Sequence, residues 1–470
     1  MSDLQHDAKT SGGELIRYLI FILVGFTAGL TLAGCAVPIK GGFSDVEKIT
    51  EDRLNQRIHW IQGMPEDAQV EQEIDSLLVD ELSVDAAVQI ALLNNRTLQS
   101  QYEALGIAQA DLVQAGLLKN PVFEAGVRIS NSASSATNTE LGLVQNFLDI
   151  LVRPARKGLA TAQFEEAKIR VGNAVLNLAY DTKSAYYMLQ GAMHITTMLR
   201  TAVEATATAA EFARRQQAAG NLSDLEYAVQ QTLHEQIRLD LVANEAMVLD
   251  NRERLTRLMG LWGPQTDWRI SDRLPDLPSD EVPLEHLESL AVSRRLDLAV
   301  MRWEIEALAR ALSITVHWRY VPLIDVGVNT EKESDGARVT GPTVSIELPI
   351  FDQGQAKVAH AEALLRQARQ RMTARAIEIR SEARVARNRL LVSRAVAVHY
   401  RTTLIPLREQ IVAESQRFFN FMLIGAYQLL QAKRDEIEAY QDYIEAVRNY
   451  WVARSEVERV AAGPITATEP

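Results

Sequence analysis

Two kinds of hydrophobic periodicity alternate along this chain of 470 residues. Between residues 339 and 351, apolar and polar side chains alternate with a period of two, as in a β-strand with one apolar and one hydrated face. After Gly354 no proline occurs until Pro406 and no glycine until Gly425, and good helix formers fill the interval. At ~1.5 Å per residue such a helix is tens of ångströms long. The pattern therefore predicts an elongated, tube-like molecule.

The same order of elements is predicted twice. The first half, residues 82–259, reads as a helix to about 118, strands at about 121–130 and 139–148, a long helix to about 219 and another long helix. The second half, residues 284–462, repeats this order, with strands at about 322–330 and 339–351. Between the halves, the four prolines of residues 260–283 predict a linker.

Three pairs of markers support an internal duplication. Pro121 and Pro322 are 201 residues apart, and Asp149 and Asp352 are 203 residues apart. Gly220 and Gly425, 205 residues apart, each stand where a long helix stops and the next one starts. A spacing near 200 residues predicts two similar halves, and both glycines are expected to take the left-handed conformation that ends a helix.

The four strand patterns raise a problem of closure. Each is about nine residues long, which suits a tilted membrane-spanning strand. Four strands cannot enclose a water-filled lumen, and lipid does not tolerate open sheet edges. Either the chain oligomerises into a barrel or the strands form a soluble sheet. The charged faces favour the barrel, and the residues expected in its lumen are Glu124, Arg128, Glu140, Asp325 and Glu347.

The N-terminus carries a targeting signal. An apolar run from Tyr18 to Leu32 follows Lys9 and Arg17 and ends in small residues, which predicts a signal peptide over residues 1–34. Leu32-Ala-Gly-Cys35 resembles the lipobox of bacterial lipoproteins, which implies lipidation of Cys35. An uncleaved anchor helix is the alternative. Once the signal peptide is removed, residues 35–81 would form the N-terminal segment of the mature chain, and residues 463–470 would form a C-terminal tail.

Composition argues against other functions. The net charge is −12 without a basic stripe, so no nucleic-acid partner is expected. Cys35 is the single cysteine, and the eight histidines show no ligand spacing, so no metal site is expected. Phosphate-binding loops are absent from the sequence. We therefore expect no catalytic residue, no cofactor and no enzymatic activity.

Several motifs, taken together and in their order along the chain, carry a family resemblance. They are Asn120-Pro121, Gly260-Leu-Trp-Gly-Pro264, Leu348-Pro-Ile-Phe-Asp-Gln-Gly354 and the segment 425–432. In this order the chain resembles the TolC-like outer-membrane efflux channel family, and the lipobox resembles its lipoprotein branch. The resemblance implies a mainly α-helical protein with a membrane β-barrel. Three protomers would contribute four strands each to a twelve-stranded barrel, and their long helices to a periplasmic tunnel.

The resemblance also implies a function and partners. The trimer would be a passive, lipid-anchored exit duct in the outer membrane, docked to a periplasmic adaptor protein and an inner-membrane pump. It would expel small toxic solutes, either drugs or heavy-metal ions. Two alternatives stay open: the channel of a one-step protein secretion system, and a periplasmic coiled-coil scaffold without a pore.

At the periplasmic tip the resemblance implies adaptor contacts at the two turns, through Gly220, Asn221, Gly425 and Ala426. The family often has acidic residues just after the turn. Here Glu226 follows the first turn, and Gln431, Arg434 and Asp435 follow the second. These four are the gate candidates, with Arg434 expected to pair with Glu226 or Asp435.

Overall fold

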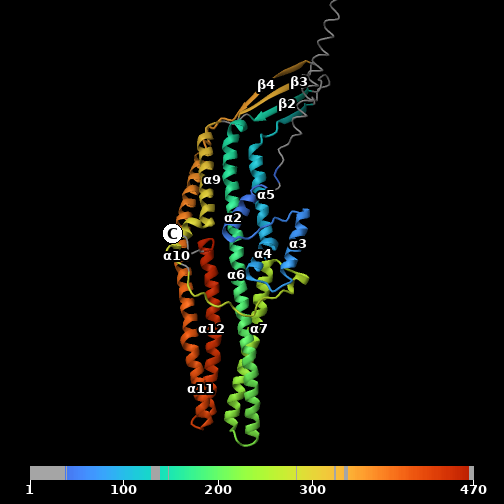
Figure 1. Cartoon of the computed structure of the whole chain (residues 1–470). Helices are drawn as coiled ribbons and strands as arrows, with labels where there is room; N and C mark the ends of the chain where they lie inside the picture. The colour runs from blue at the N-terminus through green and yellow to red at the C-terminus, as the bar shows by residue number, and fades with distance from the viewer. Residues whose placement is uncertain are drawn as a thin grey trace, which may run out of the picture.

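The structure is a computed structural model that describes residues 37–38, 40–128, 138–146, 148–281, 283–321, 324–332 and 337–464. The predicted signal peptide and Cys35 lie outside these residues. The molecule is elongated, with a sheet at one end and the turns of two helical hairpins at the other (Figure 1). Within the described ranges, none of the helices combines the length and the apolar character needed to cross a bilayer.

Two long antiparallel helical hairpins form the body. The first consists of α6 (Leu148–Ala218) and α7 (Asp224–Met259). The second consists of α10 (Gln355–His399), the π-helical turn η2 (Tyr400–Leu404), α11 (Ile405–Asn420) and α12 (Ala426–Ala461). The hairpins lie side by side, and α12 packs against α6 (Figure 1). The predicted elongated shape and the duplication are therefore confirmed.

The shorter helices differ from the prediction at one point in each half. The helix expected from residue 82 to 118 is broken at Asn95 into α4 (Val84–Asn94) and α5 (Arg96–Gly116). Its counterpart is broken at Arg295 into α8 (Leu287–Arg294) and α9 (Leu296–Trp318). Both break residues have extended backbone, and the Asn95 side chain caps α5 by accepting from the Leu98 amide at 2.9 Å.

The N-terminal segment and the linker brace the hairpins from outside. Helices α2 (Phe43–Leu54) and α3 (Pro65–Leu77) come before the first repeat. Phe43 of α2 forms a buried aromatic cluster with Trp60 and Tyr102, and α2 packs on α6. The linker is extended apart from the short 3-10 helix η1 (Gly263–Thr266).

One antiparallel sheet joins the two halves. Its order is β1 (Val122–Arg128), β2 (Asn138–Asn146), β3 (Ile324–Lys332) and β4 (Arg338–Ile346). The prediction that the last strand reaches residue 351 is wrong. The strand ends at Ile346, which pairs with Ile324, the first residue of β3. Pro349 lacks the amide hydrogen that a ladder needs, and Glu347 lies outside the strand.

The apolar residues of α7 are buried only in part. Leu233, Ile237 and Leu255 are buried in core clusters that include residues of α6. Leu225, in the first turn of α7, is 74% exposed because it stands beside the open hairpin turn.

Candidate functional site

The sheet presents one polar and one apolar face. The strand register aligns Glu124 with Gly142, Gly126 with Glu140, and Asp325 with Ser345. Because facing residues of paired strands share a side of the sheet, the charged residues of β1 and β2 and the acidic residues of β3 gather on one face, whereas the facing pair Lys332 and Arg338 lies on the other. Among the predicted lumen residues, the structure brings four together on this polar face: Glu124, Arg128, Glu140 and Asp325.

Hydrogen bonds tie the polar face together across strands. Glu140 accepts from Arg128 Nη2 at 3.0 Å and from Asn329 Nδ2 at 2.6 Å. Asp325 Oδ1 accepts from Asn146 Nδ2 at 2.8 Å, which links the two repeats. The face is therefore a hydrogen-bonded polar surface, and the sequence alone did not identify Asn146 and Asn329 as its donors.

A glycine lets two strands approach closely in the middle of this face. A Cβ atom built on Gly327 would lie 2.7 Å from the Leu143 carbonyl oxygen and 2.9 Å from Thr343 Oγ1. Any larger side chain would push β3 away from its neighbours. Gly327 therefore preserves the pairing that connects the first repeat to the second.

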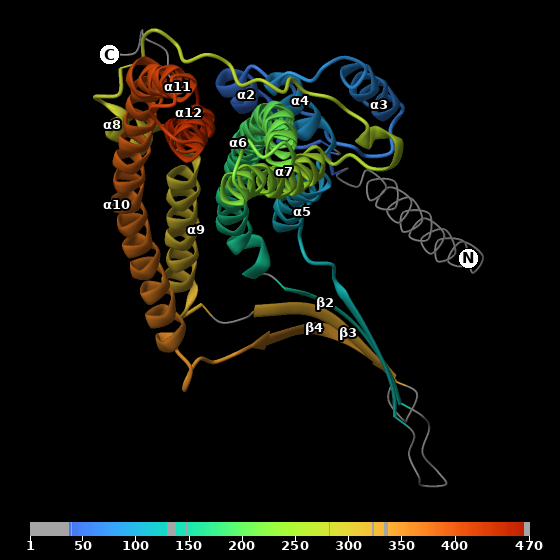
Figure 2. The ribbon, with the colours of Figure 1, turned by 90° about the horizontal axis from the view of Figure 1, so that it is seen from below.

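The opposite face is apolar and exposed. Phe123, Val127, Leu143, Val326 and Val344 all stand on it, more than 40% exposed. No helix of the described residues packs extensively on either face, and Figure 2 shows the sheet as a curved ribbon standing away from the helices. Among the residues that the structure describes, strands β1 and β4 also have one unpaired edge each. An exposed apolar face with two free edges indicates an element that is covered outside this chain.

The first hairpin turn follows the prediction. Gly220 adopts a left-handed conformation with φ of +77°. Its amide donates to the Gln217 carbonyl at 3.0 Å, and the Asn221 amide donates to the Gln216 carbonyl at 2.9 Å. These bonds satisfy carbonyl groups at the end of α6, as helix C-terminal motifs do.

The second turn corrects the pairing of Gly220 with Gly425. Met422, with φ of +59°, is the left-handed residue, and the Leu423 amide donates to the Phe418 carbonyl at 2.9 Å. Gly425 has extended backbone, with φ of −83° and ψ of 167°, and it begins α12 instead of ending α11. Gly220 and Met422 are 202 residues apart, so the expected left-handed conformation of Gly425 is wrong.

The gate candidate Glu226 serves its own helix. Its carboxylate accepts from the Ser223 amide at 3.1 Å and from Ser223 Oγ at 2.8 Å, which closes a capping box at the start of α7. The backbone hydrogen bond from Ser223 lowers the pKa of Glu226. The counterpart of Glu226, 202 residues further along the chain, is Gln428, whose Oε1 accepts from the Gly425 amide at 2.7 Å. Gln428, and not the gate candidate Gln431, therefore occupies the position that corresponds to Glu226.

The other gate candidates are also arranged differently from the prediction. Asp435 accepts from Arg408 Nη1 on α11 at 2.8 Å and from Gln431 Nε2 at 2.7 Å. Arg434 is exposed on α12 and pairs with neither Asp435 nor Glu226. The expected pairs of Arg434 with these carboxylates are therefore wrong within this chain.

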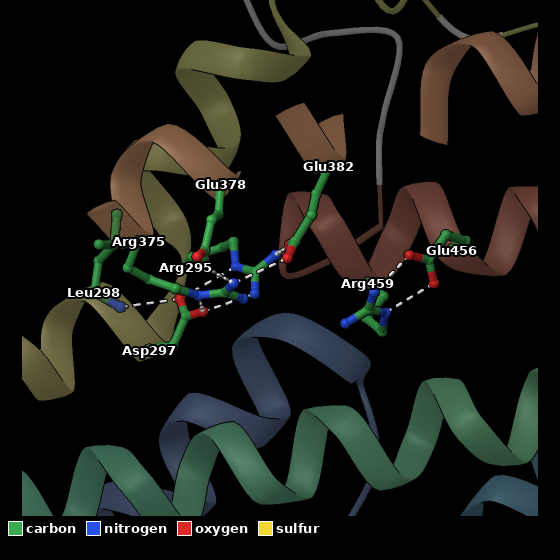
Figure 3. Close-up of polar contacts among 8 residues, drawn as sticks. All are labelled: Arg295, Asp297, Leu298, Arg375, Glu378, Glu382, Glu456 and Arg459. Carbon is green, nitrogen blue, oxygen red and sulfur yellow. Dashed lines mark hydrogen bonds and ion pairs between the residues drawn. The ribbon is translucent and has the colours of Figure 1, made fainter. Parts of the chain in front are cut away.

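A network of charged residues holds the break between α8 and α9 against α10 (Figure 3). Asp297 accepts from Arg295 at 2.7 Å and from Arg375 at 2.9 Å, and Arg375 also pairs with Glu382 at 2.9 Å. Burial alone would raise the pKa of Asp297, but hydrogen bonds and charge from the two arginines hold it below its ordinary value. The network substitutes charged contacts for the Asn95 cap of the first repeat.

The linker runs along one side of the layer formed by the long helices, and a polar groove lies on the other side. The linker carbonyls of Ser279 and Pro275 accept from Arg394 at 2.6 Å and from Trp451 at 3.0 Å. On α12, Asn449 and Glu456 point away from Trp451 by helical geometry, and both line a groove of about 850 Å³ between α6, α10 and α12.

Acidic residues contribute to this groove without forming a metal centre. Asp181 and Asp442 also line it, and Asp442 accepts from the Tyr400 hydroxyl at 2.9 Å. Burial raises the pKa of Asp181. Over the described ranges, no three His, Cys, Asp or Glu side chains converge closely enough to hold a metal ion.

The fold and the sheet define a class of elongated helical proteins in which a small sheet extends from long paired hairpins. Residues 87–261 match the family described as "Outer membrane efflux protein". The chain is also similar to the cobalt-zinc-cadmium resistance protein CzcC of Cupriavidus metallidurans, with 23% identity over 81% of this chain and 90% of that protein.

Solved structures share the fold. A membrane protein from Pseudomonas aeruginosa superimposes with a TM-score of 0.71 at 18% identity, covering 82% of this chain and 93% of its own. The CmeC outer membrane channel of Campylobacter jejuni gives a TM-score of 0.67 at 15% identity, with 82% and 87% covered. The resemblance to TolC-like outer-membrane efflux channels is thus supported by the family match over residues 87–261 and by a fold shared with solved outer-membrane channels.

Proposed function

We propose that this protein is the trimeric exit duct of a tripartite efflux system, docked to a periplasmic adaptor and an inner-membrane pump. The observation that carries the proposal is the open sheet, with its polar face, its exposed apolar face and its two free edges. In lipid every backbone group must be paired. Three copies joined edge to edge would leave no edge, with polar residues around a lumen and apolar residues against lipid.

The helices offer a matching surface for a neighbouring copy. On α10 and α11, exposed apolar residues recur in steps of 7, 4, 11, 4 and 7, the spacing of a coiled-coil seam. They are Val385, Val392, Val396, Leu407, Ile411 and Phe418. On α7, Leu239, Val242 and Leu249 form a second exposed stripe. Two different surfaces that pack together build a closed ring when the rotation from copy to copy closes, as an edge-to-edge barrel of three copies would require.

The two stripes overlap along the length of the molecule. Asn244 of α7 donates to the Ala192 carbonyl of α6 at 2.8 Å, and Ala397 of α10 belongs to one core cluster with Ile195 of α6. Val242 and Val396 therefore lie at similar heights, and both are more than 40% exposed, although Val396 also lines the groove. In a ring, the Val242 of one copy would face the Val396 of the next.

The proposed cargo is a heavy-metal cation, because the relative CzcC is described as a cobalt-zinc-cadmium resistance protein. Polar and acidic groups along the groove, among them Asp181, Asp442 and Glu456, are compatible with the passage of hydrated cations. The adaptor would meet the turns, through Gly220, Asn221, Gly425 and Ala426, at the end remote from the sheet (Figure 1). Cys35 would carry the lipid anchor.

Disulfide trapping tests the ring. In a Cys35→Ser background, Val242→Cys combined with Val396→Cys should form intermolecular disulfides in membranes, up to a species of three chains. Each single substitution alone serves as the control and should give no such ladder. A double variant that stays monomeric under oxidation contradicts the trimer. A trimer whose loss in the native host leaves cobalt, zinc and cadmium tolerance unchanged contradicts the metal cargo.

A further inference from the structure

The two hairpin turns lie at the same end of the molecule but differ in chemistry (Figure 1). From residue 418 to residue 432 the second hairpin carries no charged side chain. Phe421, Met422 and Leu423 project from it, and each is at least 69% exposed. In contrast, the first turn is followed directly by Asp224 and Glu226.

Met422 is both strained and exposed. Its left-handed backbone is unfavourable for a residue with a Cβ atom, and the equivalent position of the first hairpin is Gly220. The Met422 side chain is 93% exposed, so contacts with the described part of the chain do not account for its conformation. Strained residues persist where their side chains have a function, which indicates a contact of Met422 outside its own chain.

The carboxylates near the two turns are already bonded within their own hairpins, so they do not form a charge-paired gate. Glu226 is bonded to Ser223, Asp435 to Arg408, and Glu414 to Arg417 at 3.1 Å. These carboxylates stabilise their own helices. What the second turn offers to a partner is therefore apolar surface.

Symmetry identifies the partner. Around the axis of a ring, each residue meets its own copies, so like meets like. Acidic residues such as Asp224 and Glu226 would repel their copies there, whereas an uncharged apolar turn can pack against itself. The second turn is thus suited to the axis and the first to the periphery.

We propose that Phe421, Met422 and Leu423 of each copy pack together at the axis and close the tunnel by excluding water. An apolar constriction blocks ions by dewetting, without a ring of charges. This inference rests on the trimeric duct proposed above. It replaces the expected charged gate of Glu226, Arg434 and Asp435 with an apolar one.

Conductance of the full-length trimer in planar bilayers tests the closure. Met422→Asp places like charges at the axis, and Met422→Gly removes the side chain without strain. Both should raise the time-averaged conductance several-fold over wild type. Leu225→Asp is the control, because Leu225 is an exposed apolar residue beside the first turn, and the substitution introduces the same charge there. It should conduct like wild type.

The outcomes separate this inference from the proposed function. If Met422→Asp and Met422→Gly conduct like an ion-conducting wild type, or if Leu225→Asp raises conductance as much, the apolar closure is overturned and the duct stands. If trimers of wild type and of every variant conduct nothing, both are overturned. Wild-type conductance divided by bulk conductivity should not rise between 0.1 M and 1 M KCl, whereas a steep rise with salt would identify a charge-pair gate.

Discussion

Gly220 and Met422, 202 residues apart, end the descending helices of the two hairpins in the same left-handed conformation, with φ of +77° and +59°. The same spacing separates Gly260 and Ala462, the left-handed residues that end α7 and α12. The duplication therefore preserves backbone conformation at both ends of each hairpin, even where glycine is not retained.

This relationship predicts opposite effects of one substitution at the two turn glycines. Gly220→Ser should lower the free energy of unfolding by about 1 kcal/mol, because a Cβ atom is disfavoured in the left-handed region. Gly425→Ser should raise it by a few tenths of a kcal/mol, because serine at an extended N-cap can accept from the Gln428 amide, as Ser223 does from Glu226. Denaturant unfolding of the solubilised protein measures both. Equal losses at both positions would contradict the conformations described for the two turns.

The Asp297 network predicts a pH-dependent contribution to stability. Asp297 is 19% exposed and Arg295 10%, so Asp297→Asn should destabilise the protein by about 2–3 kcal/mol at pH 7, somewhat below the loss expected for a fully buried pair. The pKa of Asp297 is lower in the folded state than its ordinary value of 3.8. The charged carboxylate thus stabilises the fold above that value, and this contribution disappears as pH falls through the folded pKa.

Unfolding of wild type and Asp297→Asn at several pH values checks this. The difference between them should be constant from pH 7 to pH 5 and shrink below pH 4. Asp250→Asn, at an exposed position on α7, is the control and should change stability by less than about 0.5 kcal/mol. A difference that stays constant down to pH 2 would show that the Asp297 charge is not the stabilising element.

Periodicity alone was sufficient to predict the sheet, the long helices and their duplication, because alternating and helical patterns are local properties of the chain. The turn at Gly425 was misassigned because glycine suits both a left-handed helix end and an extended N-cap, and only the backbone distinguishes them. The breaks at Asn95 and Arg295 depend on distant contacts. Asn94 donates to the Gly260 carbonyl at 2.8 Å, and Arg53 donates to the Arg294 carbonyl at 2.8 Å.

The candidate site could be predicted from the sequence only in part. The alternation placed Glu124, Arg128, Glu140 and Asp325 on one face, because side chains of a strand alternate with a fixed period. Glu347 does not belong to this face because β4 ends at Ile346, shortly before Pro349, which lacks the amide hydrogen that a ladder needs. The role of Asp435 was missed because its partner, Arg408, belongs to a different helix and lies 27 residues away in sequence.

Lipid modification of Cys35 is predicted from the four residues that end in it, Leu32-Ala-Gly-Cys35. Mass spectrometry of protein extracted from the outer membrane should find a mature N-terminus at Cys35 carrying diacylglycerol and an acyl chain. Cys35→Ser should lose this modification but still assemble trimers, since burial of the apolar sheet face anchors the protein independently. Wild-type protein that retains residues 1–34 with an unmodified Cys35 would contradict the prediction.

Thiol labelling of the sheet in intact membranes is the most direct test of the outer-membrane channel, because it reports which face meets water. In a Cys35→Ser background, Glu124→Cys, Asp325→Cys and Thr343→Cys stand on the polar face, and Val127→Cys, Val326→Cys and Val344→Cys stand on the apolar face. A membrane-impermeant charged maleimide should label the first set and spare the second, and a lipid-soluble maleimide should label both. Equal labelling of neighbours such as Asp325→Cys and Val326→Cys by the charged reagent would contradict a barrel with a hydrated lumen.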